Sequence, residues 1–203
     1  MLVQRYPVMD CCRESISAAV TALIDCFQSG HKLLVCGNGG SAADSLHIVG
    51  ELMKGFILPR KMPEEEQARL RACSSNADYL IENLQGALSA VSLVHETALT
   101  TAFANDKAAD LDFAQQVYGY GCAGDALFAI STSGNSKNVL YAIDVARLKG
   151  MKVISLTGAA GGRMKTCSDI LIPVPEAETY KVQELHLPVY HTICLALENE
   201  FFG

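Results

Sequence analysis

The hydrophobic residues of this chain fall into short apolar runs that alternate with longer stretches of helical spacing. Each short run is typical of a buried strand, and turn residues such as glycine follow several of them. The predicted strands are residues 32–36, 88–93, 126–130, 152–156 and 170–172. Apolar residues recur every three or four positions in the intervening stretches, which predicts helices. These helices cover residues 8–28, 41–54, 95–104, 109–119, 137–148 and 179–202.

This alternation predicts the fold class. Strands that alternate with helices imply crossover connections and a parallel sheet with both faces covered. We therefore expect an α/β fold, a three-layer αβα sandwich with a five-stranded parallel sheet and flanking N- and C-terminal helices. A chain of 203 residues suits a single domain over 1–203. The polar stretch at about 61–85, which opens with Pro63 and three glutamates, is predicted to form a helical excursion.

Composition narrows the function classes. The net charge of −6 argues against nucleic acid as the main partner, because nucleic-acid phosphates bind clustered Lys and Arg. No run of 18 apolar residues predicts a membrane span, and the first residues lack the pattern of a signal peptide. The eight cysteines are scattered, with no CxxC pair, which is typical of reduced thiols. We expect a cytoplasmic protein with no membrane partner.

The first predicted strand is followed by a loop that suits an anion. Its sequence is Cys36-Gly37-Asn38-Gly39-Gly40-Ser41. Glycines allow backbone N–H groups to approach a ligand closely, and Ser41 stands where a helix would begin. The positive end of the helix dipole also favours negative charge there. Asn38, Gly39, Gly40 and Ser41 are therefore candidate phosphate-binding residues.

A second loop of this kind follows the third predicted strand. It reads Ser131-Thr132-Ser133-Gly134-Asn135-Ser136 and holds four hydroxyl groups. Ligands of open α/β sheets bind at the carboxyl ends of strands, so Ser131, Thr132, Ser133 and Ser136 are candidate phosphate donors. Two such loops at equivalent places favour a ligand site over ordinary turns. Neither loop has the last glycine of G-x-G-x-x-G or a Walker lysine, so a phosphomonoester fits better than a nucleotide.

The two loops, together with further motifs, resemble a known family. Besides the loops, the motif residues are Asp44, His47 and Glu51, then Val182-Gln183-Glu184-Leu185-His186 with His191. These resemble the sugar isomerase (SIS) domain and, within it, the phosphoheptose isomerases. The resemblance covers about residues 8–203, apart from the excursion, and it implies the SIS fold, which is flavodoxin-like.

His47 and Glu51 are four residues apart, so they lie on one face of the helix that starts at the first loop. Aldose–ketose isomerisation needs a base for a carbon-bound proton and an acid for the oxygens, and Glu and His suit both tasks. The resemblance implies that Glu51 is the base and His191 the acid. It also implies that Gln183 and Asp106 contact substrate. In some members zinc is bound at the positions of His47, Glu51, Gln183 and His191.

The leading functional hypothesis is a sugar-phosphate isomerase that interconverts a ketose and an aldose. By resemblance, its substrate is sedoheptulose 7-phosphate, which gives glycero-manno-heptose 7-phosphate, or a related sugar. Tyr180 stands where heptose isomerases carry a substrate-binding Asp, which leaves the sugar open. The resemblance also implies a homotetramer with its sites between subunits. The alternatives are a non-catalytic SIS module, which binds a sugar phosphate as a regulator or protein adaptor, and a lyase or etherase of an amino-sugar phosphate.

Overall fold

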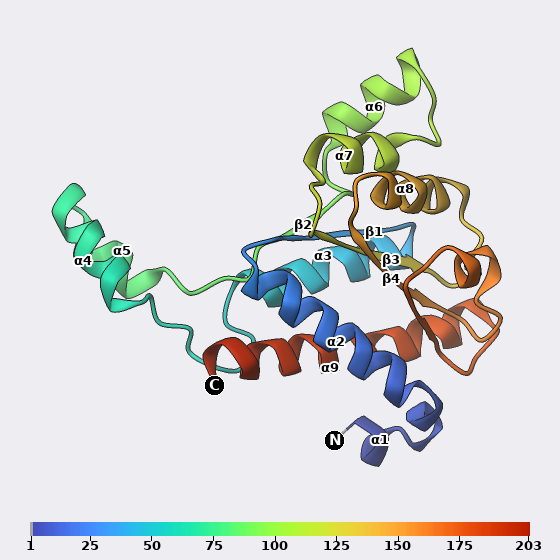
Figure 1. Ribbon diagram of the computed structural model, residues 1–203, viewed down its shortest axis with the longest axis horizontal. Coiled ribbons are helices and arrows are strands. Elements are labelled where there is room, and N and C mark those ends of the chain that lie inside the picture. The colour runs from blue at the N-terminus through green and yellow to red at the C-terminus, as the bar shows by residue number, and fades with distance from the viewer. Residues whose placement is uncertain (1) are drawn as a thin grey trace.

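The computed structural model describes residues 2–203 and has one parallel sheet at its centre (Figure 1). Its strands are β1 (Leu33–Gly37), β2 (Ala90–Ser92), β3 (Ala126–Ser131), β4 (Lys152–Thr157) and β5 (Ile170–Pro173). They are hydrogen-bonded in the order β2-β1-β3-β4-β5, and all four pairings are parallel. The predicted five-stranded parallel sheet is confirmed, and the order is that of flavodoxin-like folds.

The helices of the body follow the predicted pattern. They are α2 (Arg13–Gln28), α3 (Gly40–Met53), α7 (Asp112–Tyr120), α8 (Lys137–Leu148) and α9 (Thr179–Phe202). Two short 3-10 helices accompany them, η1 (Pro7–Cys12) and η2 (Gly162–Thr166). The prediction of one helix over residues 8–28 was wrong in its first part, where η1 precedes α2. This tighter first turn starts at Pro7 and buries Met9 and Cys12.

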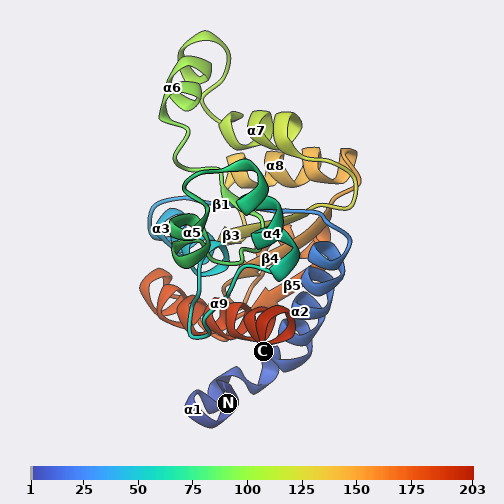
Figure 2. The same cartoon turned by 90° about the vertical axis from the view of Figure 1, so that its left-hand side faces the viewer.

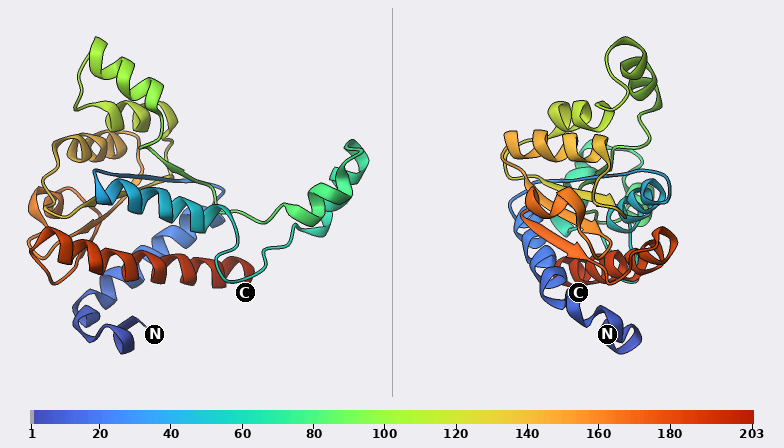
Figure 3. Two further views of the ribbon diagram at one scale, coloured as in Figure 1. Left: turned by 180° about the vertical axis from the view of Figure 1, so that it is seen from behind. Right: turned by 90° about the vertical axis from the view of Figure 1, so that its right-hand side faces the viewer.

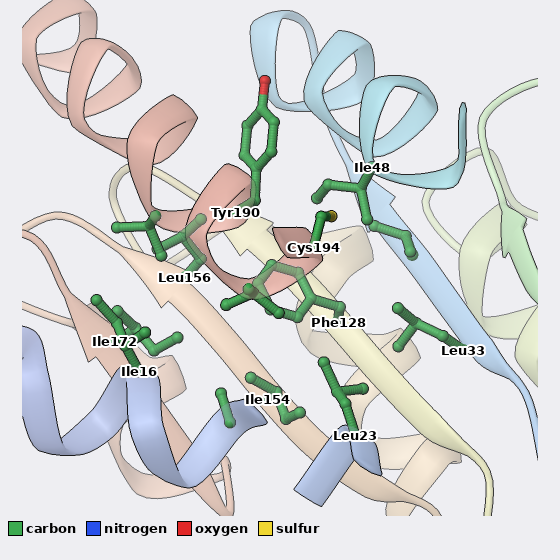
Figure 4. Packing of buried hydrophobic residues seen from close by; sticks show 14 of the residues in the cluster. Ile16, Leu23, Leu33, Ile48, Phe128, Ile154, Leu156, Ile172, Tyr190 and Cys194 are labelled. Carbon is green, nitrogen blue, oxygen red and sulfur yellow. The ribbon is translucent and has the colours of Figure 1, made fainter. Parts of the chain in front are cut away.

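Alternate residues of the strands face two separate apolar layers. Val35, Phe128 and Ile154 pack with the buried faces of α2, α3 and α9. Their neighbours Leu34 and Leu127 belong to the cluster on the other face, which α7 and α8 complete. Figure 3 shows these helices on either side of the sheet, and Figure 4 shows the packing of the α9 side. The αβα sandwich is therefore confirmed, with period-two alternation of the strands as its cause.

Four helices differ from those of the body because few or none of their residues are buried. The excursion contains α4 (Glu64–Cys73) and α5 (Ala77–Asn83), which project from the body in Figure 1 and lie in front of it in Figure 2. At another corner, α6 (Thr97–Asp106) extends beyond α7 and has no buried residue. The short helix α1 (Leu2–Arg5) likewise has no buried residue. Among residues 2–203, no helix is long and apolar enough to cross a bilayer.

Candidate active site

The loops after β1 and β3 are neighbours at the point where the strand order reverses. β1 and β3 pair directly, with Gly37 opposite Ile130, while β2 lies on the far side of β1. Sheets of this order bind ligands in the crevice between the first and third strands, outside their carboxyl ends. The two loops that the sequence singled out therefore meet where the topology favours a ligand.

The first loop depends on glycine for its shape. A Cβ on Gly37 would lie 2.7 Å from the carbonyl oxygen of Ser41, so no larger residue fits there. Gly39 has a φ of 56°, in the left-handed region that favours glycine, and α3 begins at the next residue. The N–H groups of Ser41, Ala42 and Ala43 donate to the carbonyls of Asn38 and Gly39 within this turn, and the positive end of the helix dipole favours an anion here.

Hydrogen bonds order the second loop and join it to the first. Ser131 Oγ and Ser136 Oγ lie 2.9 Å apart across the loop. The side-chain amides of Asn38 and Asn138 donate to each other, at 2.8 and 3.0 Å, and so link the first loop to the start of α8. Asn138 was not among the residues that the sequence predicted, because its partner is 100 positions away.

Farther along α3, four side chains form a continuous hydrogen-bonded chain. The hydroxyl of Tyr190 donates to Asp44 Oδ1 at 3.2 Å and lies 3.0 Å from His47 Nδ1. The other ring nitrogen of His47, Nε2, lies 3.0 Å from Glu51 Oε1. In Figure 4 the Tyr190 hydroxyl points away from the apolar core. His191 completes the group, with its ring centroid 5.0 Å from that of His47. We call these five residues the α3–α9 seam.

The direction of these hydrogen bonds favours one tautomer of His47. Because the Tyr190 hydroxyl donates to Asp44, its oxygen is left to accept a hydrogen bond from Nδ1 of His47. His47 Nε2 lies within hydrogen-bonding distance of Glu51 Oε1, at 3.0 Å. Asp44 and Tyr190 thus set both the ring orientation of His47 and the place where it meets Glu51.

Three polar atoms of the seam, Asp44 Oδ2, Glu51 Oε2 and His191 Nε2, are buried and have no hydrogen-bond partner among the described residues. Glu51 Oε2 and His191 Nε2 accept and donate no hydrogen bond within residues 2–203, although Lys54 Nζ lies 3.6 Å from Glu51 Oε2. Burial lowers the pKa of His191, and the nearby His47 lowers it further. The charge of Glu51 acts in the opposite direction and raises this pKa less than the other two lower it. Burial also raises the pKa of Asp44, in opposition to the hydrogen bond from Tyr190. Buried polar atoms without partners are rare and mark places where a ligand is expected.

Other predicted residues lie apart from the seam. Gln183 packs against the loop end of α3, where a Cβ on Gly40 would collide with its side-chain amide. Asp106 is exposed at the end of the projecting α6 and accepts a hydrogen bond only from Asn105 among the described residues. Tyr180 is 58% exposed in the first turn of α9. The structure thus brings His47, Glu51 and His191 together and leaves the other predicted residues at a distance along the helices.

The residues that the resemblance implies as zinc ligands are not arranged as a metal site in this structure. Within the described part of the chain, no group of three or more His, Cys, Asp or Glu side chains is arranged to hold a metal ion. His47 and Glu51 are bonded to each other instead. Two of the unpartnered atoms in the seam, Glu51 Oε2 and His191 Nε2, are nevertheless the kinds of ligand atom that zinc accepts.

A cavity of about 800 Å³ opens beside the seam on the outer side of α9. His191 lines it together with Phe56, whose ring centroid lies 5.4 Å from that of His191. The N-terminal residues Leu2 and Tyr6 form part of the opposite wall. His191 is therefore reached from a hollow that is separate from the two phosphate-type loops.

Comparison with known proteins decides the family. The family model of the SIS domain matches residues 8–97 and 83–158. The phosphoheptose isomerase of Citrifermentans bemidjiense is 38% identical over 188 residues, which are 93% of this chain and 85% of that protein. The chain belongs to the SIS domain family and, within it, to the phosphoheptose isomerases.

Solved structures of phosphoheptose isomerases share this fold. The one from Neisseria gonorrhoeae has a TM-score of 0.72 and 34% identity, over 91% of this chain and 86% of that chain. The one from Francisella tularensis has a TM-score of 0.79 and 29% identity, over 96% and 91%. The SIS fold that the resemblance implied is confirmed. The SIS match also runs through residues 61–85, so the excursion lies within the matched range.

Proposed function

We propose that the chain is an aldose–ketose isomerase that converts sedoheptulose 7-phosphate into glycero-manno-heptose 7-phosphate. One observation carries this proposal: Glu51 Oε2 and His191 Nε2 are buried without partners on helices that pack against each other. Membership of the phosphoheptose isomerases supports the sugar. Free thiols at all eight cysteines, which lie within the described residues, support a cytoplasmic location.

In the proposed reaction, the phosphate binds at the two loops and the carbonyl end reaches the seam. Glu51 Oε2 takes the proton from C1 of the ketose, and the electron pair forms the ene-diol double bond. The same carboxyl group then returns a proton to C2, which gives the aldose. The hydrogen bond between His47 and the other oxygen of Glu51 holds the carboxylate in place during both transfers.

His191 moves the hydroxyl proton in this scheme. Its lowered pKa keeps the imidazole neutral near neutral pH, with one nitrogen that donates and one that accepts. A neutral ring can give a proton to the C2 oxygen as the ene-diol forms and take the proton of the C1 hydroxyl as the aldehyde forms, so that one proton moves from the C1 oxygen to the C2 oxygen. The His191 ring lines the cavity beside Phe56, and its Nε2 is buried without a partner, so a ligand at this nitrogen would complete its hydrogen bonding.

We also propose that His47, Glu51, His191 and Gln183 would hold a zinc ion, with Gln183 turning from its place beside Gly40 to join the other three. Such an ion would polarise the sugar carbonyl as a Lewis acid. The fixed N–H at Nδ1 of His47 supports this, because it leaves Nε2 free of its own proton once a cation replaces the hydrogen bond to Glu51. Metal analysis of the purified protein, with a His47→Gln variant as control, tests the site independently of turnover.

The site is proposed to be completed by a second copy of the chain in a homotetramer. Exposed apolar side chains flank the seam, with Leu46 at 45% and Met53 at 46% on α3 and Leu187 at 41% on α9. Asp106 stands on a projecting helix of its own chain, where it would reach the site of a neighbour. A mass of four times 21.8 kDa in light scattering is expected, and a monomer would contradict it.

Subunit complementation tests the role of Asp106. Glu51→Gln and Asp106→Asn should each abolish turnover when they are expressed alone. Co-expressed subunits that exchange residues across an interface would rebuild one intact site in each mixed pair, and so restore about a quarter of wild-type activity. Asp106→Asn with normal activity would remove Asp106 from the site.

The runner-up is a non-catalytic SIS module that binds sugar phosphates as a regulator or adaptor. Such a module would use the two loops but would have no need of Glu51 and His191. Purified protein is incubated with sedoheptulose 7-phosphate and a panel of other sugar phosphates, and isomers are measured by NMR. Conversion of the heptose supports the enzyme. Micromolar binding with no turnover of any sugar would support the module instead.

A further inference from the structure

A buried ion pair lies beneath the seam and has no part in the proposed chemistry. Arg60 follows α3 in the stem of the excursion, and Glu198 lies in α9, two turns after His191. Both residues are 1% exposed, and Arg60 Nε donates to Glu198 Oε1 at 2.9 Å. Burying two charges is costly, and apolar side chains of similar volume often give equal stability. Stability alone therefore does not explain this ion pair, and its hydrogen-bond partners point to a second role.

Arg60 is bonded to the end of the helix that carries Glu51. Its Nη2 donates to the backbone carbonyl of Glu51 at 2.8 Å, and its Nη1 donates to that of Leu52 at 2.6 Å. Carbonyls in the last turn of a helix have no partner within the helix, and a cation there also complements the helix dipole. Arg60 thus holds the backbone of the proposed base directly.

Glu198 is hydrogen-bonded to the backbone of residues 56–58, the segment whose Phe56 lies beside His191. Its carboxylate accepts hydrogen bonds from the backbone N–H groups of Phe56, Ile57 and Leu58, at 2.7, 2.8 and 3.2 Å. Burial raises the pKa of Glu198, but these three donors and Arg60 outweigh it, so that the pKa is lowered and the group stays ionised. The fixed segment places the Phe56 ring against His191, with centroids 5.4 Å apart.

We propose that Arg60 and Glu198 are positioning residues, which set the spacing between Glu51 on α3 and His191 on α9. Arg60 holds Glu51 through its backbone, and Glu198 holds His191 through Phe56. Figure 3 shows the end of α3, the stem of the excursion and the C-terminal part of α9 close together. A displacement of about 1 Å between two reacting groups costs about 100-fold in rate, so this spacing matters to the reaction.

The kinetic test rests on the proposed isomerase function. Arg60→Met should lower kcat by about 100-fold and change KM by less than about threefold, because the loops that bind phosphate are untouched. Arg60→Lys keeps the charge and can still reach one carbonyl, so it should recover part of kcat. Glu198→Gln should lower kcat in the same way. If Arg60→Met fails to fold, Arg60→Lys and Glu198→Gln still decide the question.

The matched control is Asp125→Asn, which weakens a different buried carboxylate. Asp125 is 1% exposed and accepts hydrogen bonds from Lys32 and from the backbone of Cys122, none of which contacts the seam. At an equal loss of melting temperature, this variant should keep kcat within twofold of wild type. Variants of Arg60 and Glu198 that also keep kcat within twofold would overturn the proposal.

A second readout separates this inference from the proposed function. The NMR signal of the His191 ring, assigned with a His191→Gln variant, should shift or broaden in Arg60→Lys and Glu198→Gln but not in Asp125→Asn. An unchanged signal in both variants would overturn the inference even in a protein without turnover. If the wild-type protein isomerises no sugar phosphate but the His191 signal shifts in the variants, only the proposed function is contradicted.

Discussion

The loops after β1 and β3 consist of contiguous residues, whereas the seam joins side chains that are as far apart as Asp44 and Tyr190, 146 positions away. The loops offer backbone N–H groups and hydroxyls, which bind the phosphate of any sugar equally well. The seam offers a carboxylate and imidazoles, which can move protons. In the proposed function, affinity therefore belongs to the loops at the starts of α3 and α8, and chemistry belongs to the seam between α3 and α9. Each should be removable alone.

Glu51→Gln is expected to have the largest effect, because it should abolish turnover and leave substrate binding at the loops intact. Loss of the carboxylate removes the proposed base, and turnover should fall by about 10⁴-fold. The loops remain intact, so the dissociation constant for sedoheptulose 7-phosphate should stay within a few-fold of wild type. Calorimetric titration next to a rate assay measures both quantities. Normal turnover would exclude Glu51 from the mechanism, and lost binding would refute the separation.

Ser133→Ala makes the complementary change in the second loop. One hydrogen bond to a charged phosphate is worth about 1.5–3 kcal/mol, so KM should rise roughly 10- to 100-fold. The value of kcat at saturating substrate should stay within about twofold of wild type. Thr21→Ala, which removes an exposed hydroxyl from α2, serves as a control. A fall in kcat with an unchanged KM would show that the loop does more than bind.

Tyr190→Phe tests the seam with a smaller change. The variant keeps the ring in the core but loses the hydroxyl that joins Asp44 to His47. Without this partner His47 can rotate away from Glu51, and kcat should fall by about tenfold at an unchanged KM. Steady-state kinetics of the variant measures both parameters. An unaltered kcat would mean that the hydrogen-bonded chain does not orient Glu51.

The smallest effect on kcat is expected at His186, which lies on α9 between Gln183 and His191 and is fully buried. Burial lowers its pKa to about 4 against a slight opposing effect of the Thr157 backbone. The unfolded chain, with a pKa of about 6.5, binds more protons than the native protein in this window. The contribution of neutral His186 to the free energy of unfolding is therefore fully present above pH 6.5. It should fall by about 3 kcal/mol as the pH is lowered to 4.

Urea unfolding of wild type and His186→Leu from pH 7 to pH 4 measures this loss. The variant should show a flatter dependence on pH, because leucine has no proton to gain. Its kcat at neutral pH should equal that of wild type, since His186 belongs to neither region. Parallel curves for the two proteins would contradict the buried neutral state of His186.

Local patterns explain what the sequence could predict. The sheet, the body helices and both loops follow from apolar periodicity and from runs of glycine and hydroxyl residues. The pair of His47 and Glu51 was visible from its four-residue spacing. The partners of that pair were not visible, because Tyr190 and Asp44 meet only after α9 packs on α3. For the same reason, no spacing rule pointed to Arg60 and Glu198, which are 138 positions apart.

Proton transfer from carbon by Glu51 is the central claim, and isomerisation of sedoheptulose 7-phosphate in D₂O tests it most directly. NMR of the aldose product should show deuterium from solvent at C2 with the wild-type protein, because the proton on the carboxyl group exchanges before it is returned. Glu51→Gln should form no labelled product. Aldose that forms at full rate without any deuterium would indicate direct hydride transfer and would contradict the account.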